Sequence, residues 1–106
     1  MDGGLISDRL FGRRCRLPIA AWITQQQKDR FYQSEVPLFG TTSRSNVIEE
    51  LRRLSELGML TEVRPDDTSR VYYVRTASPL WDVVELAADT IGLRWDNGHV
   101  DLGQLT

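Results

Sequence analysis

The sequence predicts a single α+β domain that is mostly helical, with a two-stranded β-hairpin and a C-terminal helix. Apolar residues recur at helical spacing in several segments, and two β-rich runs flank a segment of turn-forming residues. No repeat or long linker divides the 106 residues, of which 41% are hydrophobic and 26% charged, as is typical of one globular domain. We therefore expect residues 1–106 to share one core.

Two helices are predicted in the N-terminal quarter of the chain, on either side of a basic turn. The first runs from Ser7 to Phe11, because Ser7 is a good N-terminal cap and Gly12 readily ends a helix. The second starts around Pro18, which suits a first turn because no hydrogen bond there needs its missing N–H. Apolar spacing predicts that this helix ends near Lys28.

A short strand and a short helix are predicted next. The aromatic pair Phe31–Tyr32 indicates an extended segment. Ser34 is expected to cap a brief helix through Phe39, with Pro37 in its first turn and Gly40 at its end.

The most strongly patterned helix is predicted from Ser43 to Leu57. Ser43 is expected to cap it, and Gly58 to end it in a left-handed conformation. Its apolar stripe consists of Val47, Leu51 and Leu54, widened by Ile48 and Leu57.

A β-hairpin is predicted after this helix. Met59–Val63 and Val71–Arg75 are rich in β-branched and aromatic residues, and residues 64–70 between them carry Pro, Asp and Ser, which favour a turn. The two runs are therefore expected to pair.

The last helix is predicted over residues 78–92. Ser78 and Pro79 open it as cap and first residue, and apolar residues follow at helical spacing. Residues 93–106 form a tail, in which Asn97–Gly98 is compatible with either a small hairpin or a mobile segment.

The cysteine content and the hydropathy pattern bear on the compartment. Cys15 is the single cysteine and forms no internal disulfide, which favours a reducing environment. Cys15 has two possible roles. It is either a buried core thiol or a redox-active thiol whose pKa is lowered by neighbouring arginines. No signal sequence or 18-residue apolar stretch is present, so we expect a cytoplasmic protein without membrane contact.

Charge is distributed unevenly, although the net charge is only −2. Residues 7–75 carry twelve Lys or Arg against nine Asp or Glu, whereas residues 76–106 carry Arg94 against five acids. A basic body with an acidic end is compatible with a nucleic-acid binder, and the acidic total argues against binding driven by charge alone.

The predicted order of helices, short strand and hairpin resembles the winged helix-turn-helix of ArsR/MarR-type transcriptional regulators. The resemblance spans about residues 7–93. Its most specific residues are Ser34-Glu35-Val36, Gly40, Ser43, Ser45-Asn46-Val47, Leu51, Leu54 and Leu57-Gly58-Met59-Leu60-Thr61. The resemblance implies sequence-specific binding of double-stranded DNA by residues 7–75, with helix 43–57 in the major groove and a wing at 64–70 on the backbone.

The resemblance also implies a set of DNA contacts at the start of helix 43–57. Arg44 suits guanine, because its fork can donate to O6 and N7 together, and Asn46 suits adenine. The predicted set is Thr42, Ser43, Arg44, Ser45, Asn46 and Arg53, with Arg13, Arg14, Arg16, Arg64 and Arg70 on phosphates. Capping, ion pairing with nearby carboxylates and simple solvation are the alternative roles for these residues.

Glu49 and Glu50 depart from the pattern of a DNA-binding helix. A carboxylate is repelled by phosphates, although Glu can accept a hydrogen bond from cytosine N4. The acidic pair therefore indicates either selection against wrong sequences or a helix that faces protein. The alternative functions are a winged-helix adaptor for protein binding and a phage-type architectural or recombination factor.

The C-terminal helix predicts a homodimer. Related regulators pair through terminal helices, which would set two recognition helices about one DNA turn apart. The interface residues predicted are Leu80, Trp81, Val84, Ala88 and Ile91. The alternative is that this helix only completes the core of one chain.

Catalysis and metal binding are not expected. His99 is the single histidine, and no acid pair stands beside a nucleophile in a recognisable motif. Metal sensing needs paired Cys or His ligands that the sequence lacks. We therefore expect no enzyme activity, no metal and no cofactor.

Overall fold

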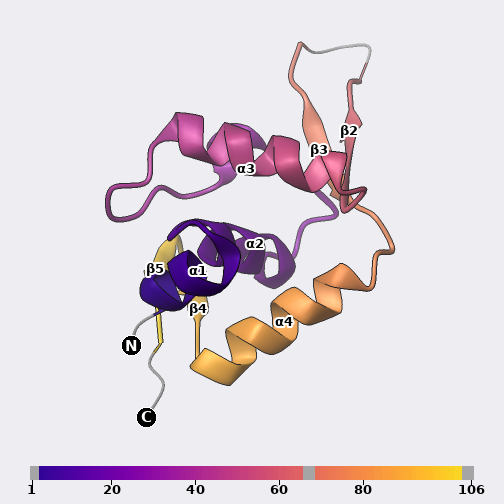
Figure 1. The fold of residues 1–106 in the computed structure, drawn as a ribbon. Coiled ribbons are helices and arrows are strands. Elements are labelled where there is room, and N and C mark those ends of the chain that lie inside the picture. The colour runs from indigo at the N-terminus through magenta and orange to yellow at the C-terminus, as the bar shows by residue number, and fades with distance from the viewer. Residues whose placement is uncertain (1–2, 66–68, 104–106) are drawn as a thin grey trace.

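The computed structural model describes residues 3–65 and 69–103, and it is a mostly helical α+β fold as predicted. Its elements in chain order are α1 (Gly3–Phe11), α2 (Arg16–Gln25), β1 (Arg30–Tyr32), the 3-10 turn η1 (Gln33–Glu35), α3 (Arg44–Glu56), β2 (Leu60–Val63), β3 (Tyr72–Arg75), α4 (Leu80–Ile91), β4 (Arg94–Asp96) and β5 (His99–Asp101). Figure 1 shows α3 and the β2–β3 hairpin on one side of the molecule and α4 on the opposite side.

The first two helices differ from the prediction in their starts and ends. Ser7 lies inside α1 and is fully buried, where its hydroxyl donates to the Arg13 carbonyl and accepts from the Leu17 amide. The prediction that Ser7 caps α1 is therefore wrong. Helix α2 ends at Gln25, before Lys28, because the Gln26 side chain bonds both backbone groups of Lys28 and closes a turn there.

The helix predicted from Ser34 to Phe39 is wrong, because the chain forms only the 3-10 turn η1 and is then irregular. Pro37 explains this outcome. A residue before proline is driven out of the helical region, and Val36 has extended backbone with φ −69° and ψ 118°. Proline thus ends the turn instead of starting a helix.

Helix α3 and the hairpin match the prediction. Ser43 caps α3 by accepting from the Asn46 amide at 3.2 Å, and Gly58 has the left-handed φ of +76° after its end. β3 lies between β1 and β2 in an antiparallel sheet, with Phe31 opposite Tyr73. The predicted turn residues 66–68 lie outside the described part of the chain.

Two clusters of buried residues form the core. The larger joins α2, α3, the sheet and the start of α4, with Phe31 stacked on Tyr73 at 5.7 Å between ring centroids. The smaller joins α2 to the end of α4 and to Leu93. Helix α2 contributes to both clusters and is therefore the central element of the fold.

Helix α4 packs on the body of the protein through residues predicted for a dimer interface. Trp81, Ala88 and Ile91 are buried inside the chain, and the Trp81 indole donates to the Met59 carbonyl at 2.9 Å. The prediction that these three residues form an intermolecular surface is therefore wrong. Val84 is half-buried between the two clusters, and Leu80 remains 45% exposed.

The segment after α4 is a hairpin, which settles one of the two alternatives for the tail. Asn97 and Gly98 both have positive φ, as a two-residue hairpin turn requires. Trp95 packs edge-on against Phe39 at 5.5 Å and donates to the Pro18 carbonyl at 2.8 Å. These contacts fasten the β4–β5 hairpin to α2 and to the loop before α3.

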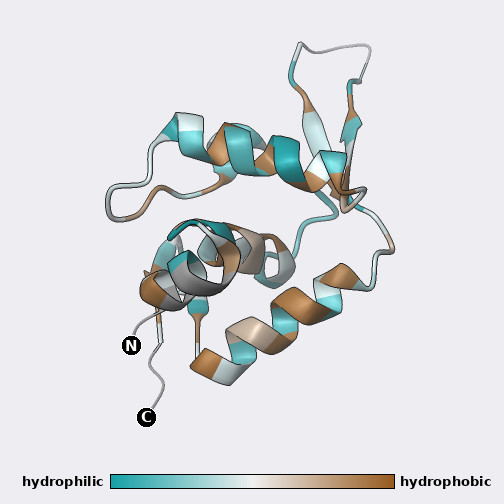
Figure 2. Ribbon diagram, viewed as in Figure 1, coloured by the Kyte–Doolittle hydropathy of each residue, from teal (hydrophilic) through white to brown (hydrophobic). Residues whose placement is uncertain are grey.

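The two outer helices differ in character, since α3 is mostly hydrophilic and α4 mostly hydrophobic in Figure 2. Among the described residues, no helix has both the length and the apolar content needed to span a bilayer.

We predict that Trp95→Ala lowers the free energy of unfolding by about 3 kcal/mol, because it removes a large packed ring and a hydrogen bond. Urea denaturation of both proteins measures the change. Leu57→Ala is the control, because Leu57 is 61% exposed and its loss is expected to change stability by less than about 0.5 kcal/mol. An equally small effect at Trp95 would mean that the β4–β5 hairpin adds nothing to the core.

Candidate nucleic-acid interface

Helix α3 presents an exposed polar face on the side away from the core. Val47 and Leu51 are fully buried against the rest of the protein. Five residues of the same helix are exposed, at positions three or four apart that place them on the opposite face: Ser45, Glu49, Arg52, Arg53 and Glu56. This outward face of α3, defined by these five residues, is the candidate site, and Figure 1 shows the β2–β3 hairpin rising beside it.

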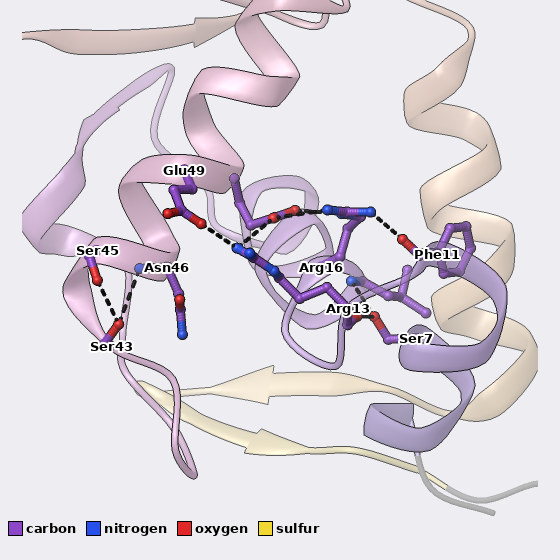
Figure 3. A network of polar contacts seen from close by, with 10 residues as sticks. Ser7, Phe11, Arg13, Arg16, Ser43, Ser45, Asn46 and Glu49 are labelled. Carbon is purple, nitrogen blue, oxygen red and sulfur yellow. Dashed lines mark hydrogen bonds and ion pairs between the residues drawn. The ribbon is translucent and has the colours of Figure 1, made fainter.

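The start of α3 combines a cap with exposed hydroxyl groups. Ser43 and Ser45 are exposed and their hydroxyl oxygens lie 3.0 Å apart, while Asn46 is half-buried (Figure 3). The first N–H groups of a helix point out of its end with a partial positive charge, which favours a phosphate there. Thr42 is half-buried, and its backbone N–H is already bonded to the Phe39 carbonyl.

Glu50 does not lie on the outward face. Its side chain is on the inner side of α3, and 2% of the residue's surface is exposed. Its carboxylate accepts from Arg16 Nε at 2.8 Å and from Arg13 Nη1 at 3.2 Å. A buried carboxylate needs such partners, because water no longer solvates it. The acidic pair in the sequence thus has one inward and one outward member.

Arg13 links the two members of the acidic pair. Its Nη1 atom also donates to Glu49 Oε2 at 2.8 Å, and this hydrogen bond is the largest cause of the raised pKa of the Arg13 guanidinium. Figure 3 shows Arg13 reaching α3 from the turn between α1 and α2. Ion pairing, one of the alternative roles, therefore holds for Arg13 and Arg16, whereas Arg14 is exposed.

The turn that carries these arginines is itself fixed in place. The Arg16 guanidinium donates to the Phe11 carbonyl at the end of α1. Ser7 bridges α1 to the Arg13 carbonyl and the Leu17 amide, as described above. Sequence reasoning missed this network because its partners come from three separate segments.

Arg44 points back toward the preceding turn and away from the outward face. Its Nη1 atom donates to the Gln33 carbonyl and to the Val36 carbonyl, the latter at 2.9 Å. Arg44 therefore ties η1 to the start of α3, which is a structural task. Arg52 is an exposed residue of the outward face that the predicted contact set omitted, and its position outside the apolar stripe was the available signal.

The β2–β3 hairpin carries the two predicted wing arginines in different environments. Arg64 is exposed and lies 3.7 Å from the Glu62 carboxylate. Arg70 stacks on the Tyr32 ring with its guanidinium carbon 4.4 Å from the ring centroid. Asp66 and Asp67 lie outside the described residues.

Cys15 is a core residue, with 4% of its surface exposed. Burial raises the pKa of the Cys15 thiol, and the nearby Glu50 carboxylate raises it further, which outweighs the lowering by Arg13 and Arg16. The structure thus favours the buried thiol over the redox-active thiol.

No protein-family model, curated protein or solved structure matches this chain. Within residues 3–65 and 69–103, no three His, Cys, Asp or Glu side chains gather in an arrangement that would hold a metal ion.

We predict that Glu50→Gln lowers the free energy of unfolding by about 3 kcal/mol, because Arg13 and Arg16 lose the buried charge that they share. Glu49→Gln is the matched control, one residue away with a side chain that is 52% exposed, and should cost less than about 1 kcal/mol. Urea denaturation compares the two. Equal effects would contradict a special role for the buried carboxylate.

We also predict that Arg44→Ala lowers the free energy of unfolding by about 2 kcal/mol, because two backbone carbonyls lose a charged donor. Thermal unfolding of the variant beside Arg52→Ala, an exposed arginine on the same helix, is the measurement. A stability loss confined to Arg44 is expected. Identical melting curves for both variants and the unchanged protein would rule out the structural task.

Proposed function

We propose that this chain is a winged-helix regulator that binds double-stranded DNA with the outward face of α3 and with the β2–β3 hairpin as its wing. The order α2, β1, η1, α3 and hairpin supports this proposal, as does the position of β1 at the edge of the hairpin sheet. The resemblance to ArsR/MarR-type regulators agrees with it.

One observation carries the proposal: Glu50 is turned inward while Arg52 and Arg53 are turned outward. An acidic pair on the outer face would have repelled phosphates and would have favoured a protein partner. With Glu50 buried and Glu49 paired to Arg13, the outward face offers two arginines and a serine to a DNA groove, and its other carboxylate, Glu56, lies in the last turn of α3.

The surroundings of α3 supply contacts for the DNA backbone. The N-terminus of α3 favours a phosphate, and two exposed arginines offer further positive charge: Arg14 in the turn before α2, and Arg64 after β2, which also lies near Glu62. Arg13 and Arg16 contribute indirectly, because they neutralise the acidic pair.

The helix predicted from Ser34 to Phe39 would be the first helix of the helix-turn-helix, and the 3-10 turn η1 that replaces it is compatible with this function. In the motif that helix crosses the DNA backbone while the second helix lies in the major groove, so it must also hold the second helix in place. Here η1 and Arg44 take over the support, because the Arg44 guanidinium clamps the carbonyls of Gln33 and Val36.

Dimerisation in this proposal keeps Leu80 from the expected interface and adds Val83 and Leu86, because the buried residues of that interface are not accessible. Leu80, Val83 and Leu86 are 45%, 53% and 69% exposed and lie three residues apart, which makes one apolar stripe on the helix. A second copy of the chain would cover this stripe and present two α3 helices to an inverted repeat. The same stripe is the observation that favours the second candidate, an adaptor that binds another protein.

The test is selection of the purified protein on a pool of random duplexes, followed by salt titration on the enriched sequence. We expect an enriched inverted repeat and a steep salt dependence, because about 0.9 is added to the log slope for each phosphate neutralised. Arg53→Ala is expected to weaken binding about tenfold.

Arg94→Ala is the matched control, since Arg94 is also exposed but lies on β4 and pairs with Asp89. The affinity of the Arg94→Ala variant for the enriched duplex should equal that of the unchanged protein. Enrichment of single half-sites would contradict the dimer but would leave DNA recognition intact. A pool without any enriched sequence at low salt would refute DNA recognition and favour the adaptor.

A further inference from the structure

Glu49 occupies a position from which a side chain of α3 meets base edges, if the proposed function holds. It lies one helical turn after Ser45 and one turn before Arg53 on the outward face. The N-terminal half of a recognition helix is the part that contacts bases, and Glu49 is in the second turn of α3. Glu56 lies on the same face but in the last turn.

Arg13 makes a carboxylate tolerable at this position. Its ion pair with Glu49 Oε2, at 2.8 Å, balances the negative charge that phosphates would otherwise repel. The pair also orients the carboxylate before any ligand arrives, so less side-chain freedom is lost on binding. Both side chains keep access to solvent, at 35% for Arg13 and 52% for Glu49.

The Glu49 carboxylate retains the capacity to bind a second donor. An ionised carboxylate is an acceptor only, with about four lone-pair sites on its two oxygens. Arg13 uses one site on Oε2. The group can therefore accept from one amino group on a base edge while the ion pair stays intact.

Base chemistry selects which amino group fits. Guanine and thymine present acceptors in the major groove, which repel a carboxylate. Adenine presents its N6 amino group beside the N7 acceptor, so one carboxylate oxygen would face N7. Cytosine presents the N4 amino group with no acceptor beside it on the major-groove edge of the same base, and is the base that matches a carboxylate.

We propose that Glu49 is a specificity-determining residue that accepts a hydrogen bond from cytosine N4 in the major groove, with Arg13 as its positioning residue. This inference rests on the proposed function, and it names the base pair that the outward face of α3 selects. It also explains why an acidic residue stands in the middle of a helix that binds a polyanion.

The experiment compares the unchanged protein with Glu49→Gln in selection from a random duplex pool. A glutamine amide has both a donor and an acceptor, which match N7 and N6 of adenine. We expect a C·G pair at one position of each half-site for the unchanged protein. In Glu49→Gln that position should change to A·T, with the preference for cytosine over adenine falling at least about tenfold.

Two further variants complete the design. Glu56→Gln, on the same face in the last turn, is the matched control and should keep the cytosine preference. Glu49→Ala removes the hydrogen-bond acceptor, and this variant should bind duplexes with any of the four base pairs at that one position. Melting curves of each variant verify that the fold is kept, which is expected because Glu49 is exposed.

The outcomes separate the two proposals. An enriched sequence that stays the same in Glu49→Gln and Glu49→Ala would overturn the role of Glu49 and leave DNA recognition intact. A change spread over the whole site in Glu49→Gln would likewise overturn it, because a base-reading residue affects one position. Failure of the unchanged protein to enrich any duplex would instead refute the proposed function itself.

Discussion

The buried carboxylate of Glu50 is the interaction on which the arrangement of the helices depends. It lies between α3 and the turn joining α1 to α2, where Arg13 and Arg16 donate to it. A charge with 2% exposure is tolerated only with such donors, and their geometry restricts how α3 sits on α2. Apolar packing of Val47 and Leu51 on the same side of α3 supplies the hydrophobic free energy. The ion pairs determine which residues of α3 remain outside.

The same network determines the charge of the candidate site. Arg13 is shared between Glu50 and Glu49, so one guanidinium serves both the core and the surface. Without it, Glu49 would lose its ion-pair partner, although Arg52 and Arg53 would still equal Glu49 and Glu56 in number. The face that results is nearly neutral, which suits recognition of particular bases better than attraction to any polyanion.

Local signals in the sequence were sufficient for most of the fold. The Ser43 cap, the apolar period of α3 and the positive-φ glycine after it act within a few residues, so they can be identified without tertiary contacts. The Asn97–Gly98 turn is also local, but the sequence left a mobile segment open beside it, and the packing of Trp95 decided for the hairpin. Errors occurred where a side chain had a distant partner or where two local rules competed. Ser34 favoured a helix start, for example, and Pro37 prevented the helix from continuing.

The sequence by itself determined the order of the four α-helices and of the hairpin strands β2 and β3, the patterned helix 43–57 and the presence of an acidic pair on that helix. Only the tertiary structure decided which member of that pair is buried. The Arg16–Glu50 contact joins residues 34 apart, and the indole of Trp81 reaches a carbonyl 22 residues away. Helical periodicity places Glu49 and Glu50 about 100° apart around the axis but does not state where the nearest arginines lie. Burial and ion pairing depend on segments that folding brings together. For that reason the sequence alone could not predict which face of helix 43–57 is exposed as the candidate site.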